Sequence, residues 1–183
     1  MTTLPHRPDC VVSTGMDVDE LQHALGGVVL ESAYLERVLR AAFSALIDSK
    51  YAAVVDSRLT AATMIEDCER IARHHTDIPG REKDRLLAAL KACHQANSRR
   101  NRVIHDAWAT RPGDVLVTLH GSRDSRDVTV TVRTPDEVRQ VADRVADAAN
   151  EVKAAMTAAF GPEWDRVEDQ LRQQLGRDIA ADI

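Results

Sequence analysis

The sequence predicts a mainly α-helical protein, an antiparallel bundle of four to five helices with a β-hairpin inserted before the last long helix. Apolar residues recur at spacings of three and four over long stretches, which is typical of amphipathic helices. Alanine, the strongest helix former, is abundant, whereas aromatic residues make up only 3% of the chain. This composition favours helices that pack closely on small side chains. Only residues 115–119 and 128–132 are β-branched runs of the kind expected in strands.

We divide the chain into a flexible N-terminal tail, residues 1–16, and a single helical domain, residues 17–183. The tail contains prolines and a glycine and shows no apolar periodicity. The three cysteines are odd in number and widely spaced, which suits a reducing compartment, so we expect a cytoplasmic protein. No segment approaches the roughly 18 apolar residues of a membrane span, and no secretory signal pattern opens the chain. We therefore expect no membrane association.

The first three helices follow from apolar faces and turn signals. We expect helices from Asp17 to about Lys50, over 58–76, and from Arg81 to about Ala107. The glycine pair 26–27 lies inside the first helix, where each glycine costs about 1 kcal/mol relative to alanine. No strand precedes this pair, as a phosphate-binding loop would require, so it predicts a close helix–helix approach or a kink.

The second half of the chain contains the predicted hairpin and two more helices. The hairpin covers about 114–133, with a long charged tip between its strands. Thr134 begins the last long helix, because Pro135 suits the first helical position and Glu137 completes a capping box. A Gly-Pro pair at 161–162 ends that helix, and a short C-terminal helix follows at about 163–176.

Polar residues interrupt an apolar seam at the end of the third predicted helix. The seam steps by three and four residues and runs through Leu86, Leu90, Cys93, Asn97, Arg100 and Ile104. Arg100 is therefore in line with core positions. A neighbouring stripe carries Asn101 and His105, which are one turn apart and can touch. Arg100 and His105 are about 140° apart on an ideal helix, so they converge only if the helix ends or bends between them, or if both face a partner surface.

The segment from Arg100 to His105 (Arg-Asn-Arg-Val-Ile-His) resembles the R-x4-6-H motif of the HEPN superfamily of helical-bundle proteins. The signature covers only these residues, whereas the resemblance in architecture covers roughly 18–160. Many HEPN proteins are metal-independent endoribonucleases of toxin–antitoxin and phage-defence systems, with two protomers that join their motifs in one cleft. The resemblance implies a homodimer whose Arg100, Asn101 and His105 cleave RNA, with no cofactor and no metal. It also implies a possible cognate antitoxin or defence-system partner.

The residue types suit this chemistry. Histidine can act as an acid or a base near neutral pH, and the planar donors of arginine match phosphate oxygens. Asn101 could orient the ring of His105, while Arg99 and Arg102 would bind the RNA backbone without reading its sequence. Between residues 81 and 111, eight basic and three acidic residues give a net charge of +5, although the whole chain carries −5. A few phosphates could bind there, but a duplex-wrapping surface is excluded.

One departure limits the resemblance, and other functions remain open. Some HEPN toxins carry a tyrosine two positions after the histidine, but the residue here is Ala107, so regulation through that tyrosine does not carry over. No cysteines, histidines and carboxylates have metal-ligand spacing. The alternatives are a catalytically silent HEPN-like dimer that acts as a scaffold, a regulatory protein or an antitoxin-side partner, and a helical ligand-binding domain. Trp108 is interpreted as a core residue rather than a platform for a base.

Overall fold

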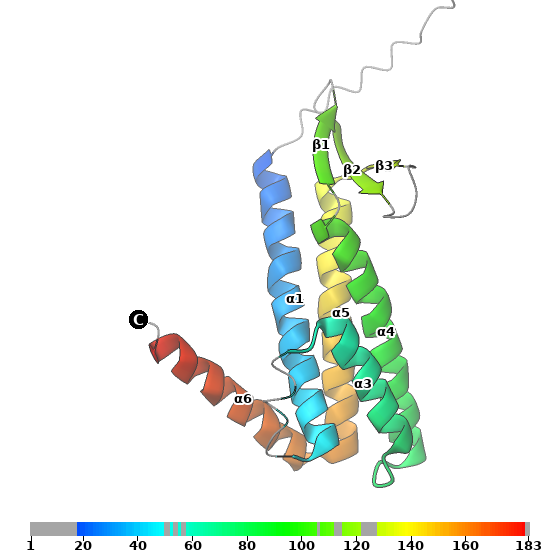
Figure 1. The fold of residues 1–183 in the computed structure, drawn as a ribbon, viewed down its shortest axis with the longest axis vertical. Coiled ribbons are helices and arrows are strands. Elements are labelled where there is room, and N and C mark those ends of the chain that lie inside the picture. Colours follow the sequence, from blue (N-terminus) through cyan, green and yellow to red (C-terminus); the bar gives the residue numbers. More distant parts are fainter. Residues whose placement is uncertain are drawn as a thin grey trace, which may run out of the picture.

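The computed structural model describes residues 18–49, 52, 55, 58–105, 107–111, 115–121 and 128–181. The predicted N-terminal tail lies outside these residues. The mainly helical class is confirmed within them (Figure 1). The helices are α1 (Val18–Ile47), α3 (Ala61–His74), α4 (Gly80–His105), α5 (Pro135–Phe160) and α6 (Pro162–Ala181). None of the described helices is both long enough and apolar enough to cross a lipid bilayer.

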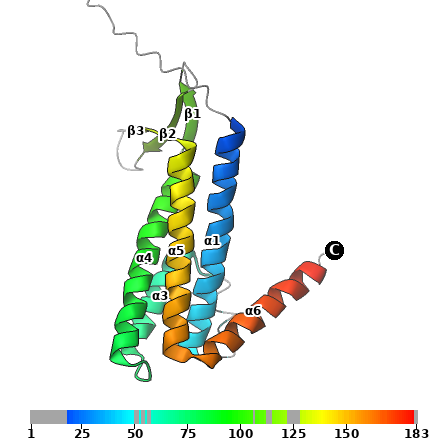
Figure 2. The same ribbon diagram turned by 180° about the vertical axis from the view of Figure 1, so that it is seen from behind.

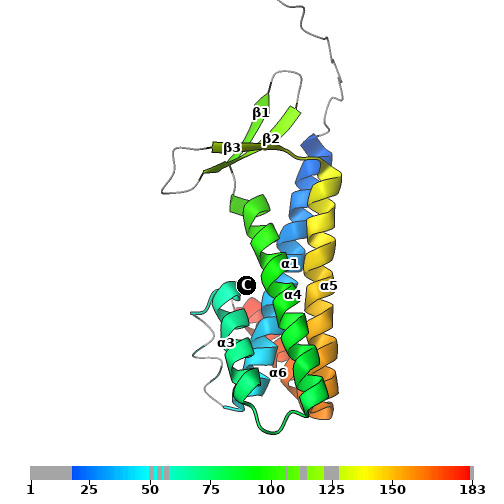
Figure 3. The ribbon, with the colours of Figure 1, turned by 90° about the vertical axis from the view of Figure 1, so that its right-hand side faces the viewer.

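Three long helices, α1, α4 and α5, lie side by side along the molecule (Figures 1 and 3). The helix α4 runs opposite to α1, but α5 runs in the same direction as α1, so neighbouring helices do not alternate throughout. The reason is that α3 repeats the direction of α1 before α4 reverses it. The helix α3 packs against α1 and α4 at the end remote from the sheet, and α6 diverges from α1 and α5 (Figure 2).

Buried apolar side chains form two clusters along the bundle. The larger cluster joins all the helices around residues such as Leu39, Ile65, Leu90 and Trp164. A smaller cluster at the sheet end contains Leu21, Ala24, Val28, Val103, Val138, Val141 and Ala142. Gly27 faces α5, where a Cβ atom would lie 3.8 Å from the Cβ of Ala142, whereas Gly26 faces open space. Only one member of the glycine pair therefore lies at a helix contact.

The ends of the helices follow local hydrogen bonding. The capping box predicted at the start of α5 is confirmed, because the Thr134 hydroxyl accepts from the Glu137 N–H and the Glu137 carboxylate accepts from the Thr134 N–H. Thr60 caps α3, so this helix begins at Ala61 rather than at 58. The backbone of Gly161 has φ +54°, a conformation that glycine adopts readily, and it separates α5 from α6.

The sheet has three strands rather than the two expected. They are β1 (Ala107–Arg111), β2 (Val115–Gly121) and β3 (Val128–Val132), antiparallel in the order β1-β2-β3. The prediction that the third helix continues to about Ala107 was wrong, because α4 ends at His105 and β1 pairs with β2 from Ala107 onwards. The predicted boundary of the C-terminal helix at about 176 was also wrong, because α6 continues through Gly176 to Ala181.

Candidate functional site at the end of α4

The residues of the R-x4-6-H motif lie in the last two turns of α4, close to the sheet. The helix α4 remains helical from Gly80 to His105, so it does not end between Arg100 and His105. Their side chains therefore leave the helix about 140° apart, as on an ideal helix. One chain alone does not bring the two side chains together, and their convergence requires a surface that both can face.

The guanidinium group of Arg100 is bound within its own chain. Its Nε donates to the Ser32 hydroxyl at 3.0 Å, and its Nη1 donates to the Asn101 side-chain oxygen at 2.9 Å. Its Nη2 lies 3.7 Å from a carboxylate oxygen of Glu36. The Ser32 hydroxyl is buried and donates in turn to the Val28 carbonyl. Arg100 thus links α4 to α1, which explains why an arginine is tolerated in an apolar seam.

The charges around the Arg100 guanidinium affect what this group of polar residues can bind. The side chain of Arg100 is 22% exposed and that of Glu36 is 37% exposed, so the pair borders solvent. Arginine has five N–H donors, and two of them are used by Ser32 and Asn101. A phosphate could bind the remaining donors, but it would have to compete with the carboxylate of Glu36. The cluster is therefore only partly prepared for an anion.

Asn101 orients Arg100 rather than His105. Its side-chain oxygen accepts the hydrogen bond from Arg100, and among the described residues no hydrogen bond joins Asn101 to His105. The expectation that Asn101 fixes the imidazole ring is therefore not met in this conformation. His105 itself is exposed at the last position of α4, where its ring is accessible to solvent and to a second molecule.

Arg99 and Arg102 are exposed on α4, as the predicted role in backbone-phosphate binding requires. They flank Arg100 in the sequence and project from the same helix as His105. Trp108 differs from them, because it is half-buried and its indole N–H donates to the Val103 carbonyl at 2.9 Å. Its contact with the smaller apolar cluster agrees with its interpretation as a core residue.

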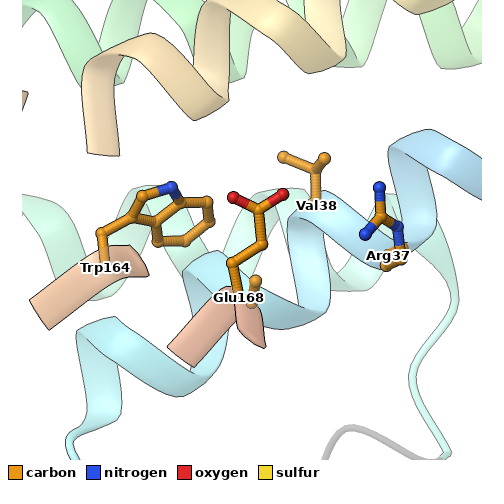
Figure 4. A pocket seen from close by; sticks show the side chains of 5 residues that line it. Arg37, Val38, Trp164 and Glu168 are labelled. Atoms are coloured by element: carbon orange, nitrogen blue, oxygen red, sulfur yellow. The ribbon is translucent and has the colours of Figure 1, made fainter. Parts of the chain in front are cut away.

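A second polar site, at the junction of α6 with α1, was not predicted from the sequence. Arg37, Val38, Ala41, Trp164 and Glu168 line a narrow pocket there (Figure 4). Glu168 is buried and accepts a hydrogen bond from Lys153 Nζ at 2.8 Å. The signal was present in the sequence, because Glu168 follows Trp164 by four residues and so lies on the same buried face of α6. The site pairs charges across helices and holds α6 in place.

The described residues do not form a metal site or a thiolate nucleophile. No group of three or more histidines, cysteines, aspartates and glutamates comes together in the described part of the chain. Cys68 and Cys93 are buried, and desolvation raises the pKa of each thiol to about 12. At neutral pH both remain protonated, and the Cys93 thiol donates to the Ala148 carbonyl.

We compared the chain with protein-family models, with curated proteins and with solved structures. None of the three comparisons found a match. The resemblance to HEPN proteins therefore rests on the motif from Arg100 to His105 and on the mainly helical fold.

Proposed function

We propose that this protein is a metal-independent endoribonuclease of the HEPN type, with a composite site that two copies of the chain form together. The observation that supports the proposal is the accessible His105 at the end of α4, with the exposed Arg99 and Arg102 and the half-buried Arg100 nearby. These residues supply a proton-transfer group and cationic donors for a phosphodiester. The protein acts in the cytoplasm as a toxin or phage-defence effector, and an antitoxin or defence-system partner restrains it.

In this proposal, one imidazole removes the proton from a ribose 2′-hydroxyl while the imidazole of the second copy protonates the leaving 5′-oxygen. The 2′-oxygen attacks the adjacent phosphorus, the bond to the 5′-oxygen breaks, and the products are a 2′,3′-cyclic phosphate and a 5′-hydroxyl end. Arg100 stabilises the charge that builds on the phosphate oxygens once RNA displaces Glu36 from the guanidinium. Arg99 and Arg102 hold the flanking backbone.

A second candidate function is a catalytically silent HEPN-like dimer that acts as a scaffold or a partner in a toxin–antitoxin pair. The contacts of Arg100 favour it, because Ser32, Asn101 and Glu36 of the same chain already engage the guanidinium. An arginine held in this way serves as a structural link between α1 and α4. In that case His105 would have no role in phosphodiester chemistry.

Cleavage of mixed RNA in the presence of EDTA separates the two functions. We expect the wild-type protein to cleave without a divalent cation. We expect His105→Ala, which removes a general acid or base, and Arg100→Ala, which removes a group that stabilises developing charge, each to lower the rate at least about 100-fold. His94→Ala is the matched control, because His94 is also an exposed histidine on α4 but lies three turns earlier. Absence of cleavage, or equal loss in the His94 variant, would contradict the ribonuclease.

A further inference from the structure

The stripe of α1 that contacts α6 continues beyond this contact as an uncovered apolar face. Arg37, Val38 and Ala41 of α1 line the junction with α6. At helical spacing, Tyr34 and Leu30 continue the same stripe towards the N-terminus of α1. Tyr34 is half-buried, whereas Leu30 is 71% exposed, the highest value for a large apolar residue in the described part of the chain. The contact with α6 therefore ends before Leu30, although the face that forms it continues.

The stripe of α6 that packs on the bundle also continues beyond the contact. Trp164 and Glu168, in the first two turns, are buried. Positions 171, 175 and 179 follow them at helical spacing, and the sequence has leucine, leucine and isoleucine there. The C-terminal end of α6 lies away from the other helices (Figure 2). The sequence therefore makes this stripe apolar over a longer part of α6 than the part that lies beside the bundle.

The two stripes have matching lengths. The helix α6 begins at the end of the molecule where α1 ends, and it runs back against the direction of α1 as it diverges (Figures 1 and 2). Leu30 precedes the α1 residues at the junction by 7 to 11 residues. Positions 175 and 179 follow Glu168 by the same 7 and 11 residues, and both intervals are about 10–17 Å at 1.5 Å per residue. A tilt of α6 towards α1 would therefore bring position 175 or 179 level with Leu30.

The junction between α5, α6 and α1 has features that favour such a tilt. Gly161, with φ +54°, joins α5 to α6, and glycine accepts changes of backbone angle that other residues resist. Trp164 is fully buried, but its indole N–H has no hydrogen-bond partner among the described residues. A buried donor without a partner costs free energy, so this position of α6 does not satisfy every polar group. The narrow pocket beside Trp164 and Glu168 separates α6 from α1 at the same place (Figure 4).

We propose that α6 closes on α1, so that residues 171–179 cover the apolar face around Leu30. Trp164 stays seated as the pivot, and Gly161 absorbs the change in direction. Closure removes Leu30 and the apolar positions of α6 from water, which favours the closed position. Ser32, the contact of Arg100 on α1, lies two residues from Leu30 and so about 160° away around the helix. The closure is therefore independent of the ribonuclease proposed above.

Disulfide formation within one chain tests the closed position. In a Cys10→Ser background, Leu30→Cys/Leu175→Cys or Leu30→Cys/Ile179→Cys should form an intrachain disulfide on mild oxidation, because closure brings one of these positions to Leu30. Leu30→Cys/Arg177→Cys is the matched control, since position 177 lies between 175 and 179 along α6 but on its opposite face. We expect the control to cross-link at least about tenfold more slowly, because its two thiols would lie on opposite sides of the docked helix.

Mass spectrometry of the unreduced, digested chain identifies the disulfide. Absence of a disulfide in both test variants would overturn the proposal. Equal rates for the control and the test variants would also overturn it, because α6 would then swing past α1 without docking on it. A disulfide that joins two chains would show that α6 docks on a second copy, and it would overturn closure within one chain.

Hydrogen exchange tests the closure in a chain with no added cysteine. Leu30→Asp places a charge in the covered face, so we expect the amides of residues 171–181 to exchange about tenfold faster, the effect of losing the burial of one leucine. Val29→Asp is the matched control, because Val29 is 55% exposed but lies about 100° around α1 from Leu30, away from α6. This control should leave the exchange unchanged. Equal exchange in Leu30→Asp and the wild type, or equal acceleration in both variants, would overturn the proposal.

Discussion

The link between Arg100 and Ser32 can be measured as a coupling free energy between α4 and α1. The perturbations are Ser32→Ala, Arg100→Met and the double variant; methionine keeps an unbranched apolar stem but removes the guanidinium. The hydrogen bond joins a charged donor to a buried hydroxyl at 3.0 Å, a type that contributes about 1.5–3 kcal/mol to stability. Arg100 is 22% exposed, so solvent screens part of this and we expect a coupling of about 1 kcal/mol.

Urea denaturation of the four proteins gives this coupling as a double-mutant cycle. Ser32→Ala alone should lower the free energy of unfolding by about 1–2 kcal/mol, or the melting temperature by a few degrees for a chain of this length. Ser98→Ala is the matched control, because the Ser98 hydroxyl also donates to a carbonyl one turn earlier, but Ser98 is exposed and this bond lies within α4. We expect this control to change stability by less than about 0.5 kcal/mol.

The cycle has a clear refuting result. A coupling below about 0.3 kcal/mol would mean that Arg100 does not hold α1 in solution, and the account of why an arginine lies in the apolar seam would then be wrong. A coupling near 1 kcal/mol together with RNA cleavage that survives Ser32→Ala would show that the link supports the fold without being required for catalysis.

Two further predictions concern buried polar groups. The thiols of Cys68 and Cys93 have pKa values of about 12 in the folded chain, above the ordinary 9.0, so the folded state holds these protons more tightly. Below about pH 9 the raised pKa values contribute fully to the free energy of unfolding, and this contribution is lost between about pH 9 and 12. The free energy of unfolding measured in urea should therefore fall over that range, and it should fall less in Cys68→Ala. An unchanged dependence of this free energy on pH in Cys68→Ala would contradict the prediction. Lys153→Met should destabilise the protein by about 1–3 kcal/mol, more than Glu168→Gln does, because it leaves the buried carboxylate of Glu168 without this cation. Thermal unfolding measures both variants, and equal effects would count against the ion pair.

Local signals in the sequence predicted much of the helical framework. The capping box at Thr134 and the Gly-Pro pair at 161–162 act through neighbouring residues, so sequence spacing alone locates the start of α5 and the break after it. The strand β1 could not be found in this way. It depends on pairing with β2, and a helical pattern that leads into Trp108 competes with it locally.

In the candidate site, too, local spacing predicted some features, whereas contacts between distant parts of the chain could not be predicted. Helical spacing correctly indicated that Arg100 occupies a core-facing position, since the structure directs it towards α1. Spacing could not identify Ser32 and Glu36 as its contacts, because they lie more than 60 residues earlier in the chain. Spacing also favoured His105, four residues from Asn101, over the adjacent Arg100, whose long side chain nevertheless donates to the Asn101 oxygen.

The divergence of α6 from the bundle has a mechanical consequence. Its first turns carry the fully buried Trp164 and the ion pair of Glu168 with Lys153, whereas its C-terminal end lies away from the other helices (Figure 2). A force applied to that end therefore acts on the contacts that the first turns of α6 make with the bundle. Under load, α6 would detach from α1 before α1, α4 and α5 separate from one another.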